Sequence, residues 1–498
     1  MQQLGQGADS AKTVAELPML VLPITGRLLG MILLVSPLLL AFGLFAYNIL
    51  EIGLPYGLAW QQMLTYLVIF LFTIQLCTGA ISIIQITLSL FNTRRNTFCN
   101  RLSSRFELID SPKVQPISLI VWSHNQSDWL GETLKSLLAI NYPDYEVIII
   151  NDGSDDATLE ILELEFGLQP LNRVYRRALS TGAISAIYTS SQYPILTVID
   201  KPYTGRADSL NIGLNLARAP LVCFLEPSHL LSRNALMLLA KPFIEEPQTT
   251  LVTASTGEPE MGVNHMPITF LENLQQIERK RLFHSSLLVR SAFCLISTTN
   301  SAVRLLRKQD LIQLGGFQGS KTDNELWLNL QLVQARCKQA RPYRVRFVPD
   351  ILCWTRLITT RESLAAMHRR WQMILLQTVI GNIKMLVQQG LGWRRIALIV
   401  LLLEIVAPVL ELMGLITIPL ALLVGAITGE IAALYFFTIV IFALLKSLGG
   451  IIADEISLRR QHSFPEIIGL LLVSLVEGLS YRFLTAFWRI HGAIIFII

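Results

Sequence analysis

The stretch Glu146-Val-Ile-Ile-Ile-Asn-Asp152, followed by Gly153-Ser154-Asp155-Asp156, decides the fold of the central part of the chain. Consecutive β-branched residues indicate a strand that is buried on both faces, as in a parallel sheet. The four residues after it are typical of a turn that leads into a capped helix. We therefore predict a strand that ends at Asp152 and a helix over about Leu159 to Phe166.

The same alternation repeats on both sides of this stretch. An apolar run at 117–122 predicts a strand, and leucines at helical spacing follow it. Further strands are predicted at 195–199 and 221–225, with a helix over 207–216 between them. Alternating strands and helices indicate an α/β fold, in which a largely parallel sheet is connected by right-handed crossovers.

Polar side chains follow the carboxyl ends of these predicted strands. They are Ser123 to Asn125, Asp152, Asp200 and Glu226. Ligands of open α/β sheets bind at this edge. The sequence therefore predicts one binding site, to which all four strands contribute.

The composition limits the class of protein. The 498 residues are 52% hydrophobic and only 15% charged, and the mean hydropathy is +0.50. This excludes a disordered chain and argues against an ordinary soluble enzyme, since soluble domains carry about 25% charged residues. The net charge of +5 is too small to indicate nucleic-acid binding. None of the six cysteines forms a C-x-x-C pair, so we expect reduced thiols rather than a disulfide or zinc framework.

The apolar residues are concentrated in long runs that are typical of membrane spans. Five spans are predicted, at about 28–50, 63–91, 396–418, 419–445 and 465–487. The predicted organisation is a cytoplasmic tail at 1–27, two membrane helices within 28–93 and a soluble domain at 94–371. An amphipathic helix at 372–395 is expected to lie at the membrane interface. A C-terminal membrane region of about three helices then covers 396–498.

The positions of the basic residues predict the orientation. The segment 51–62 has no Lys or Arg, whereas four arginines follow the second span: Arg94, Arg95, Arg101 and Arg105. By the positive-inside rule the soluble domain is cytoplasmic and the chain is a multi-pass protein of the inner membrane. Four acidic residues fall within or at the ends of the C-terminal spans: Glu404, Glu411, Glu430 and Glu477. They indicate either a polar path through the bundle or span ends in reach of water and headgroups.

Several motifs of the soluble region occur in a familiar order. They are Val121-Trp-Ser-His-Asn-Gln126, Asn151-Asp-Gly-Ser-Asp-Asp156, Gly205-Arg-Ala-Asp-Ser-Leu-Asn211, Leu314-Gly-Gly-Phe317, Thr322-Asp-Asn324 and His368-Arg-Arg-Trp371. This set resembles the family-2 glycosyltransferases, whose catalytic domain has the GT-A fold. The two N-terminal spans and the C-terminal bundle resemble the membrane-bound synthases of poly-N-acetylglucosamine, cellulose and hyaluronan. The resemblance implies a cytoplasmic GT-A domain inserted in a helical transmembrane bundle.

The resemblance also implies roles for particular residues in binding a nucleotide sugar. Asp152 takes the position that contacts the base, although an Asp before Gly is also common in turns. Arg206 takes the position of a Lys near the nucleotide, and its alternative role is a surface charge. Asn125 and Glu226 complete the expected donor site.

The resemblance assigns catalysis and binding of the acceptor sugar to the last two motifs. The family uses the Asp of T-E-D as general base, but Asn324 occupies that position, so Asp323 one residue earlier is the candidate. Asp323 is equally suited to cap a helix. Arg370 and Trp371 match the end of Q-x-x-R-W and would bind the diphosphate and the acceptor sugar. Alternatively, these two residues anchor the domain at the lipid headgroups.

The metal motif of the family is altered in this chain. Its D-x-D pattern is replaced by Glu226-Pro-Ser228, followed by His229. Mg²⁺ or Mn²⁺ is implied as cofactor, with Glu226 as a weakened ligand. His229 is a candidate manganese ligand or, alternatively, a structural histidine. The first position of Q-x-x-R-W is Met367, and Gln126 replaces a Glu of the first motif.

Two hypotheses about function follow. In the first, the chain moves a sugar from a UDP-sugar donor to a growing glycan acceptor at the cytoplasmic face of the lipid bilayer. In the second, it is a catalytically inactive pseudo-glycosyltransferase subunit beside an active polysaccharide synthase or export subunit. The altered metal and base motifs are what keeps the second hypothesis open.

Overall fold

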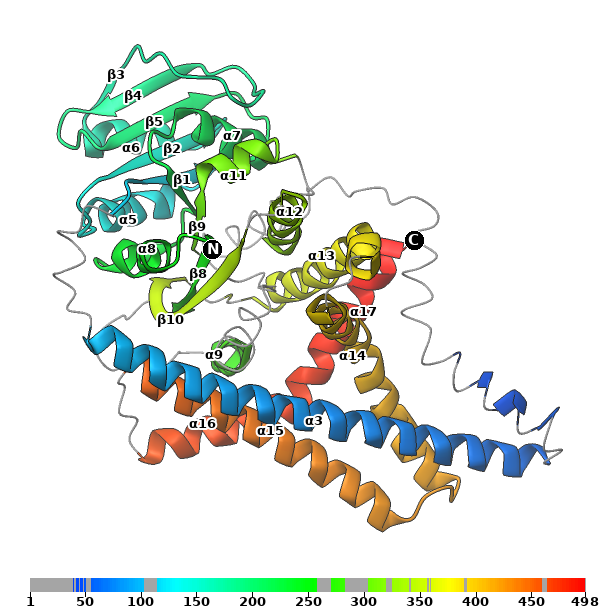
Figure 1. Ribbon diagram of the computed structural model, residues 1–498. Coiled ribbons are helices and arrows are strands. Elements are labelled where there is room, and N and C mark those ends of the chain that lie inside the picture. The colour runs from blue at the N-terminus through cyan, green and yellow to red at the C-terminus, as the bar shows by residue number, and fades with distance from the viewer. Residues whose placement is uncertain are drawn as a thin grey trace, which may run out of the picture. The chain divides into compact units, whose positions relative to one another are not determined.

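The computed structural model divides into two compact units. The sheet unit comprises 93–265 and 290–357, and the helical unit comprises 1–92, 266–289 and 358–498. Within them the structure describes residues 55–102, 114–257, 270–282, 303–318, 325–339, 342–355, 360–388, 392–458 and 464–497, with single positions at 39, 42, 43, 45–47, 49, 50 and 358. Figure 1 labels their helices and strands, and each unit is described by itself below.

The sheet unit is built on one mixed sheet of ten described strands, in the order β3-β4-β5-β2-β1-β6-β9-β8-β10-β7. The strands are β1 (Ile117–Ser123), β2 (Tyr145–Asp152), β3 (Leu168–Pro170), β4 (Ala186–Ser190), β5 (Leu196–Lys201), β6 (Leu221–Leu225), β7 (Leu230–Leu231), β8 (Thr249–Gly257), β9 (Arg304–Arg307) and β10 (Arg344–Trp354). The four central strands β5, β2, β1 and β6 are parallel. The predicted α/β fold is confirmed, and it is of the GT-A type.

Helices connect the strands as predicted. The described helices of this unit are α5 (Ser127–Leu138), α6 (Thr158–Phe166), α7 (Arg206–Leu216), α8 (Ala235–Glu245), α11 (Lys308–Gln313) and α12 (Glu325–Lys338). The antiparallel pairings β3-β4, β4-β5, β6-β9, β8-β9 and β10-β7 were not predicted. Strand β9 inserts between β6 and β8 although 78 residues of sequence separate it from β6, a pairing that no local pattern reveals.

The four central strands are buried on both faces. Val147 and Ile149 lie in the main hydrophobic core, whereas Ile148 and Ile150 point to the other face and are equally inaccessible. Side chains of this kind contribute roughly 1.5–3 kcal/mol each when fully buried. This packing makes the carboxyl ends of the strands a rigid edge on which a site can be built.

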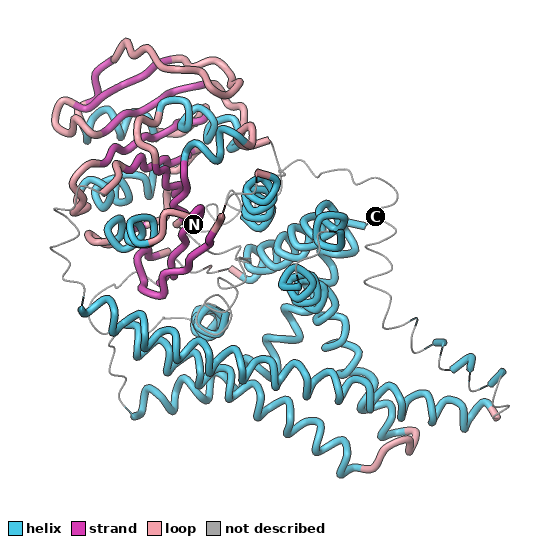
Figure 2. Tube along the Cα trace, viewed as in Figure 1, coloured by secondary structure: helices cyan, strands magenta, loops and turns pink. Residues whose placement is uncertain are grey.

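The helical unit is formed by long helices, which Figure 2 shows together with the strands of the other unit. The described helices are α3 (Tyr56–Leu102, of which residues 56–92 belong to this unit), α9 (Phe270–Leu282), α13 (Arg361–Gln388), α14 (Gly392–Leu423), α15 (Gly429–Leu458), α16 (Phe464–Val476), the π-helical segment η3 (Glu477–Tyr481) and α17 (Arg482–Ile497). Among the described residues, three stretches are long and apolar enough to cross a membrane: Tyr56–Leu88, Glu404–Leu423 and Gly429–Ile452.

These stretches differ in detail from the predicted spans. The span expected at 63–91 lies within α3, but α3 already begins at Tyr56, inside the expected loop 51–62. The boundary expected between Ile418 and Pro419 is wrong, because Pro419 lies inside α14 and the turn comes at 424–428. Proline is tolerated within apolar membrane helices, so it is a poor boundary signal there. Most of the span expected at 28–50 lies outside the described residues.

The C-terminal part also departs from the expected single span at 465–487. It is divided into α16, η3 and α17, and Arg482 at the start of α17 pairs with Glu411 of α14, with 2.7 Å between Nε and Oε1. The helix expected at 372–395 is part of α13, which begins eleven residues earlier at Arg361 and ends at Gln388. The expected domain boundary at Trp371 therefore lies inside a continuous helix.

Candidate active site

The register of the central strands brings the predicted polar residues together. Ser123 at the end of β1 pairs with Asn151 of β2, and Asp152 pairs with Lys201 at the end of β5. Strand β6 ends beside β1, where Glu226 follows directly. The predicted convergence at this edge is therefore present in the fold.

Asp152 lies at the centre of this edge, and its side chain is fully buried. Its carboxylate accepts hydrogen bonds from Trp122 Nε1 at 3.1 Å, Thr204 N at 2.9 Å and Gly205 N at 3.0 Å. Burial alone would raise the pKa of Asp152, but these donors and Lys201 hold its pKa below the usual value. Asp152 thus fixes the loop between β5 and α7. Its contact with a nucleotide base stays a prediction. For that contact, the carboxylate would have to give up one of the hydrogen bonds it accepts in this structure.

Lys201 is the residue that the sequence analysis missed. Its ammonium group is fully buried and donates hydrogen bonds to Asp152 and to the hydroxyl of Thr204. It also lies 3.6 Å from Asp208 and 3.3 Å from the hydroxyl of Ser209. The only signal in the sequence is a Lys that follows Asp200, just beyond the strand predicted at 195–199. A buried ammonium group needs such partners, because an unpaired buried charge is costly.

The first motif forms one wall of the site. Asn125 has a positive φ of 52°, its amide donates to Ser154 Oγ at 3.0 Å and its side-chain oxygen accepts from Asp155 N at 2.9 Å. His124 Nδ1 donates to the carbonyl of Asp152 at 2.7 Å. The ring of His124 lies 4.7 Å from that of Tyr203, whose side chain is 61% exposed. Asn125 therefore shapes the turn after β2, and Tyr203 presents an aromatic surface to solvent.

Arg206 and Glu226 face each other across the site. Arg206 Nη2 lies 3.3 Å from Glu226 Oε1, and the guanidinium carbon lies 5.8 Å from the ring of Trp122. The Arg206 side chain is 18% exposed, whereas that of Glu226 is 48% exposed. The structure therefore holds a guanidinium group in a fixed position, with an accessible carboxylate beside it.

His229 is arranged unfavourably for the manganese role suggested by the sequence. The Glu226 backbone amide donates to His229 Nδ1 at 3.1 Å. A neutral ring that accepts at Nδ1 carries its proton on Nε2. Nε2 in turn lies 3.8 Å from Glu226 Oε2. His229 therefore has no lone pair left for a metal in this arrangement, and it orders the turn after β6.

The other side chains at this edge suit a cation that is held mainly by oxygens of a bound ligand rather than by the protein. Among the residues that the structure describes, no cluster of three or more His, Cys, Asp or Glu has a metal-binding arrangement. Mg²⁺ is commonly bound by one or two carboxylates together with substrate phosphates and waters. The partly exposed carboxylate of Glu226 could be the single protein carboxylate of such a site. The carboxylates of this edge outnumber the cations Lys201 and Arg206: they are Asp152, Asp155, Asp156, Asp200, Asp208 and Glu226.

Two of the recognised motifs hold each other in place. The side chain of Asn211 donates to the carbonyl of Phe317 and accepts from its amide, both at 2.8 Å. Gly316 has a φ of 72°, and a Cβ atom there would collide with the Asn211 side chain. The ring of Phe317 packs edge-on against Phe224 of β6 at 5.1 Å. These contacts fix the position of Phe317 on the sheet unit. Asp323 and Asn324 lie outside the described residues.

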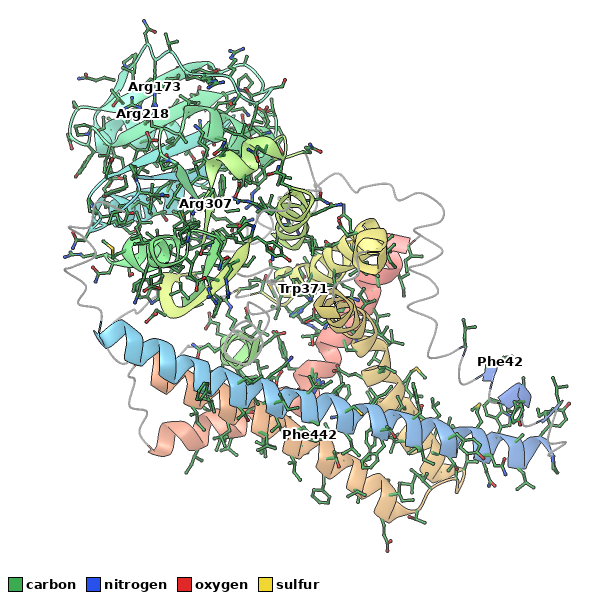
Figure 3. All side chains as sticks on the ribbon, viewed as in Figure 1. Phe42, Arg173, Arg218, Arg307, Trp371 and Phe442 are labelled. Carbon is green, nitrogen blue, oxygen red and sulfur yellow. The ribbon has the colours of Figure 1, made fainter. Side chains whose placement is uncertain are left out.

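Arg370 and Trp371 belong to the helical unit. Both lie on α13, where Figure 3 labels Trp371. The structure thus groups Asn125, Asp152, Arg206, Glu226 and His229 in the sheet unit, and it places Arg370 and Trp371 in the unit that is described separately.

Comparison with known proteins agrees with this fold. The sequence profile of glycosyl transferase family 2 matches residues 118–302. A poly-β-1,6-N-acetyl-D-glucosamine synthase of Staphylococcus aureus is 22% identical over 264 residues, which are 53% of this chain and 55% of the relative. The enzyme of the same name from Staphylococcus epidermidis is 24% identical over 260 residues, 52% of this chain and 54% of the relative. The chain thus spans about half the length of the curated relatives it matches.

Two solved structures show a weaker similarity to this chain. The mannosyltransferase PcManGT from Pyrobaculum calidifontis, in complex with GDP-Man and Mn²⁺, is 16% identical with a TM-score of 0.40, covering 81% of this chain and 99% of that one. Residues 1–349 of Staphylococcus aureus TarS, in complex with UDP-GlcNAc, are 14% identical with a TM-score of 0.36, covering 74% of this chain and 91% of that one.

Proposed function

Because residues 118–302 form a glycosyl transferase family 2 domain, we propose that this chain transfers a sugar from a UDP-sugar to a growing glycan. The observation that carries the proposal is that this profile matches the central strands, with Asp152 and Glu226 at their carboxyl ends and Arg206 at the start of α7. The curated relatives are named as synthases of poly-N-acetylglucosamine, so UDP-N-acetylglucosamine is the first donor to test.

The donor is bound at the edge formed by β1, β2, β5 and β6. Arg206 offers a planar fork of N–H groups for the diphosphate oxygens. It is held near Trp122 and Glu226, so little conformational entropy is lost when a ligand binds. The exposed ring of Tyr203 offers a stacking surface for the base. Asn125 and Asp152 support this site by fixing the two loops around it.

The transfer itself is a single displacement with inversion. The acceptor hydroxyl oxygen forms a bond to the anomeric carbon while the bond from that carbon to the diphosphate oxygen breaks. UDP leaves with the electron pair, and the hydroxyl proton passes to the carboxylate of Asp323, acting as general base. Arg370 stabilises the charge that develops on the diphosphate, and Trp371 stacks on the acceptor sugar.

The site would hold a divalent cation, Mg²⁺ or Mn²⁺, when the nucleotide-sugar donor binds. Glu226 is the residue that would hold it, together with oxygens of the diphosphate. The bound cation would neutralise charge on the leaving diphosphate. Since the chain supplies one carboxylate where the family supplies two, we expect the cation to bind weakly without a donor.

The protein acts at a lipid bilayer, as the three membrane-capable helices in the described part of the chain support. The arginines after the second predicted span favour a cytoplasmic position for the transferase domain in a multi-pass protein of the inner membrane. There the domain has access to UDP-sugars and to the glycan acceptor. A second synthase or an export subunit is a candidate partner.

The proposal is tested with the full chain, purified into lipid nanodiscs. The protein is incubated with UDP-N-acetylglucosamine, UDP-glucose or UDP-glucuronate and Mn²⁺, and release of UDP is measured. We expect release with one of these donors. A protein that binds UDP but releases none from any donor, beside an active relative as control, supports the pseudo-glycosyltransferase alternative instead. A protein that does not bind UDP contradicts both.

A further inference from the structure

The C-terminal helix α17 packs closely against the part of α13 that carries Arg370 and Trp371. We refer to three of the α17 residues in this contact, Trp488, Arg489 and Gly492, as the α17 clamp. They contact α13 at His368, Arg369 and Gln372. All six residues lie within the helical unit, so the arrangement is internal to one compact body.

Gly492 allows the two helices to approach each other closely. A Cβ atom at this position would lie 2.7 Å from the Cα of Arg369 and 2.9 Å from its carbonyl carbon. These are backbone atoms, which cannot rotate away as a side chain would. Any residue larger than glycine must therefore displace one helix relative to the other.

Arg489 adds a directional contact. Its Nε donates to the side-chain oxygen of Gln372 at 2.9 Å, and its Nη2 donates to the carbonyl of Glu404 at 2.7 Å. Gln372 is almost fully buried and donates in turn to the carbonyl of Ile405 at 3.1 Å. These three hydrogen bonds link α13, α14 and α17, and they oppose rotation of one helix relative to the others.

Trp488 completes the clamp one turn before Gly492. Its ring stacks on the buried His368 with 5.9 Å between the centroids. The other side of His368 faces Glu278 of α9 at 3.7 Å, and Tyr481 donates to the same carboxylate at 3.0 Å. His368 is thus enclosed, and α13 cannot slide along its axis without breaking these contacts.

We propose that the α17 clamp positions Arg370 and Trp371 for the transfer reaction. Both lie between the clamped positions 368, 369 and 372 on one stretch of helix, so they move when the clamp moves. The inference rests on the proposed glycosyltransferase function and assigns Trp488, Arg489 and Gly492 to it as positioning residues. A displacement of about 1 Å in a catalytic group can cost on the order of a hundredfold in rate.

The test compares two glycine substitutions in full-length protein in nanodiscs. Gly492→Ala forces the backbone of Arg369 to move. Gly469→Ala in α16 is the matched control, because a Cβ there meets nothing within 4 Å. We expect Gly492→Ala to lower kcat for UDP release by about tenfold or more. The loss of UDP affinity should be smaller than the loss of kcat, because Arg370 moves while Arg206 and the other proposed donor groups lie in the sheet unit. The control should keep wild-type kcat.

A second pair of variants guards against a folding defect. Gln372→Met removes the acceptor for Arg489, whereas Gln372→Glu keeps an oxygen there. The Met variant should lose more kcat than the Glu variant, and in both the loss of UDP affinity should be smaller than the loss of kcat. Equal kcat in wild type, Gly492→Ala and Gln372→Met would overturn the inference.

Hydrogen exchange supplies a readout that does not depend on turnover. Amides of 366–374 should exchange faster in Gly492→Ala than in Gly469→Ala, because the helix is no longer held. If exchange and kcat are both unchanged in Gly492→Ala, the role of the α17 clamp is contradicted, but the proposed glycosyltransferase function is not. A wild type that shows the clamp in exchange but turns over no donor contradicts the proposed function instead.

Discussion

The ammonium group of Lys201 lies against the carboxylate of Asp152, and both side chains are fully buried. The pair links the ends of β2 and β5 to the loop that begins α7, since Asp152 also binds the amides of Thr204 and Gly205. Arg206 follows this loop directly. The ion pair therefore helps to fix the position of Arg206, whose guanidinium group is proposed to bind the donor.

Asp152→Asn should strongly destabilise the sheet unit. The substitution leaves the Lys201 charge buried with weaker partners, and removing one member of such a pair costs about 3–5 kcal/mol. Thermal unfolding of the full chain, followed by circular dichroism, measures the effect. Glu165→Gln is the control, because the Lys135–Glu165 pair lies at the surface and exposed pairs contribute little. Equal losses in the two variants would show that the buried pair has no special weight.

The same pair predicts a pH dependence of stability. Burial opposes ionisation of Asp152 and would raise its pKa. The hydrogen bonds and the charge of Lys201 outweigh this effect, so the pKa of Asp152 lies below the usual value. A carboxyl group whose pKa is lower in the folded state stabilises the fold above its unfolded pKa of about 4. This stabilisation is lost as the pH falls through the lower, folded pKa. Wild type should therefore lose more stability between pH 5 and acid than Asp152→Asn does, as measured by the melting temperature at each pH.

Asp323→Asn should abolish turnover and leave UDP binding nearly unchanged. A general base acts mainly in the transition state, so its loss lowers kcat rather than ground-state affinity. UDP release and UDP affinity are measured on the same preparation. A variant that turns over at the wild-type rate would remove Asp323 from the role of base.

Restoring the family's carboxylates separates the two functional hypotheses. The triple variant Glu226→Asp, Ser228→Asp, Asn324→Asp should bind Mn²⁺ more tightly than wild type, because it offers two carboxylates in place of one. Titration of Mn²⁺ by electron paramagnetic resonance gives the affinity, and UDP release gives the activity. If the native chain is an active enzyme, turnover is present before the change. Turnover that appears only in the triple variant identifies the native chain as an inactive relative.

The α/β fold could be predicted because it follows from local patterns. The apolar run before Asp152 and the turn residues after it determine a buried strand and its end wherever they occur. The antiparallel strand β9 could not be predicted in the same way. Its four residues, Arg304 to Arg307, are too short for a periodic signal, and their partners lie in β6 and β8. The membrane boundaries failed at Pro419, where an apolar environment permits a proline inside a helix.

The sequence by itself determined the class of fold, the strand ends where the polar residues gather and the motifs that they carry, because each depends on neighbours along the chain. Only the tertiary structure decided what these residues do. It buried Asp152 on Lys201, turned His229 Nδ1 to the Glu226 amide and set Gly492 against the backbone of Arg369. The Asp152–Lys201 and Gly492–Arg369 contacts join residues that are distant in sequence, and the free energy of burying a charge or closing a gap exists only after the chain has folded around it.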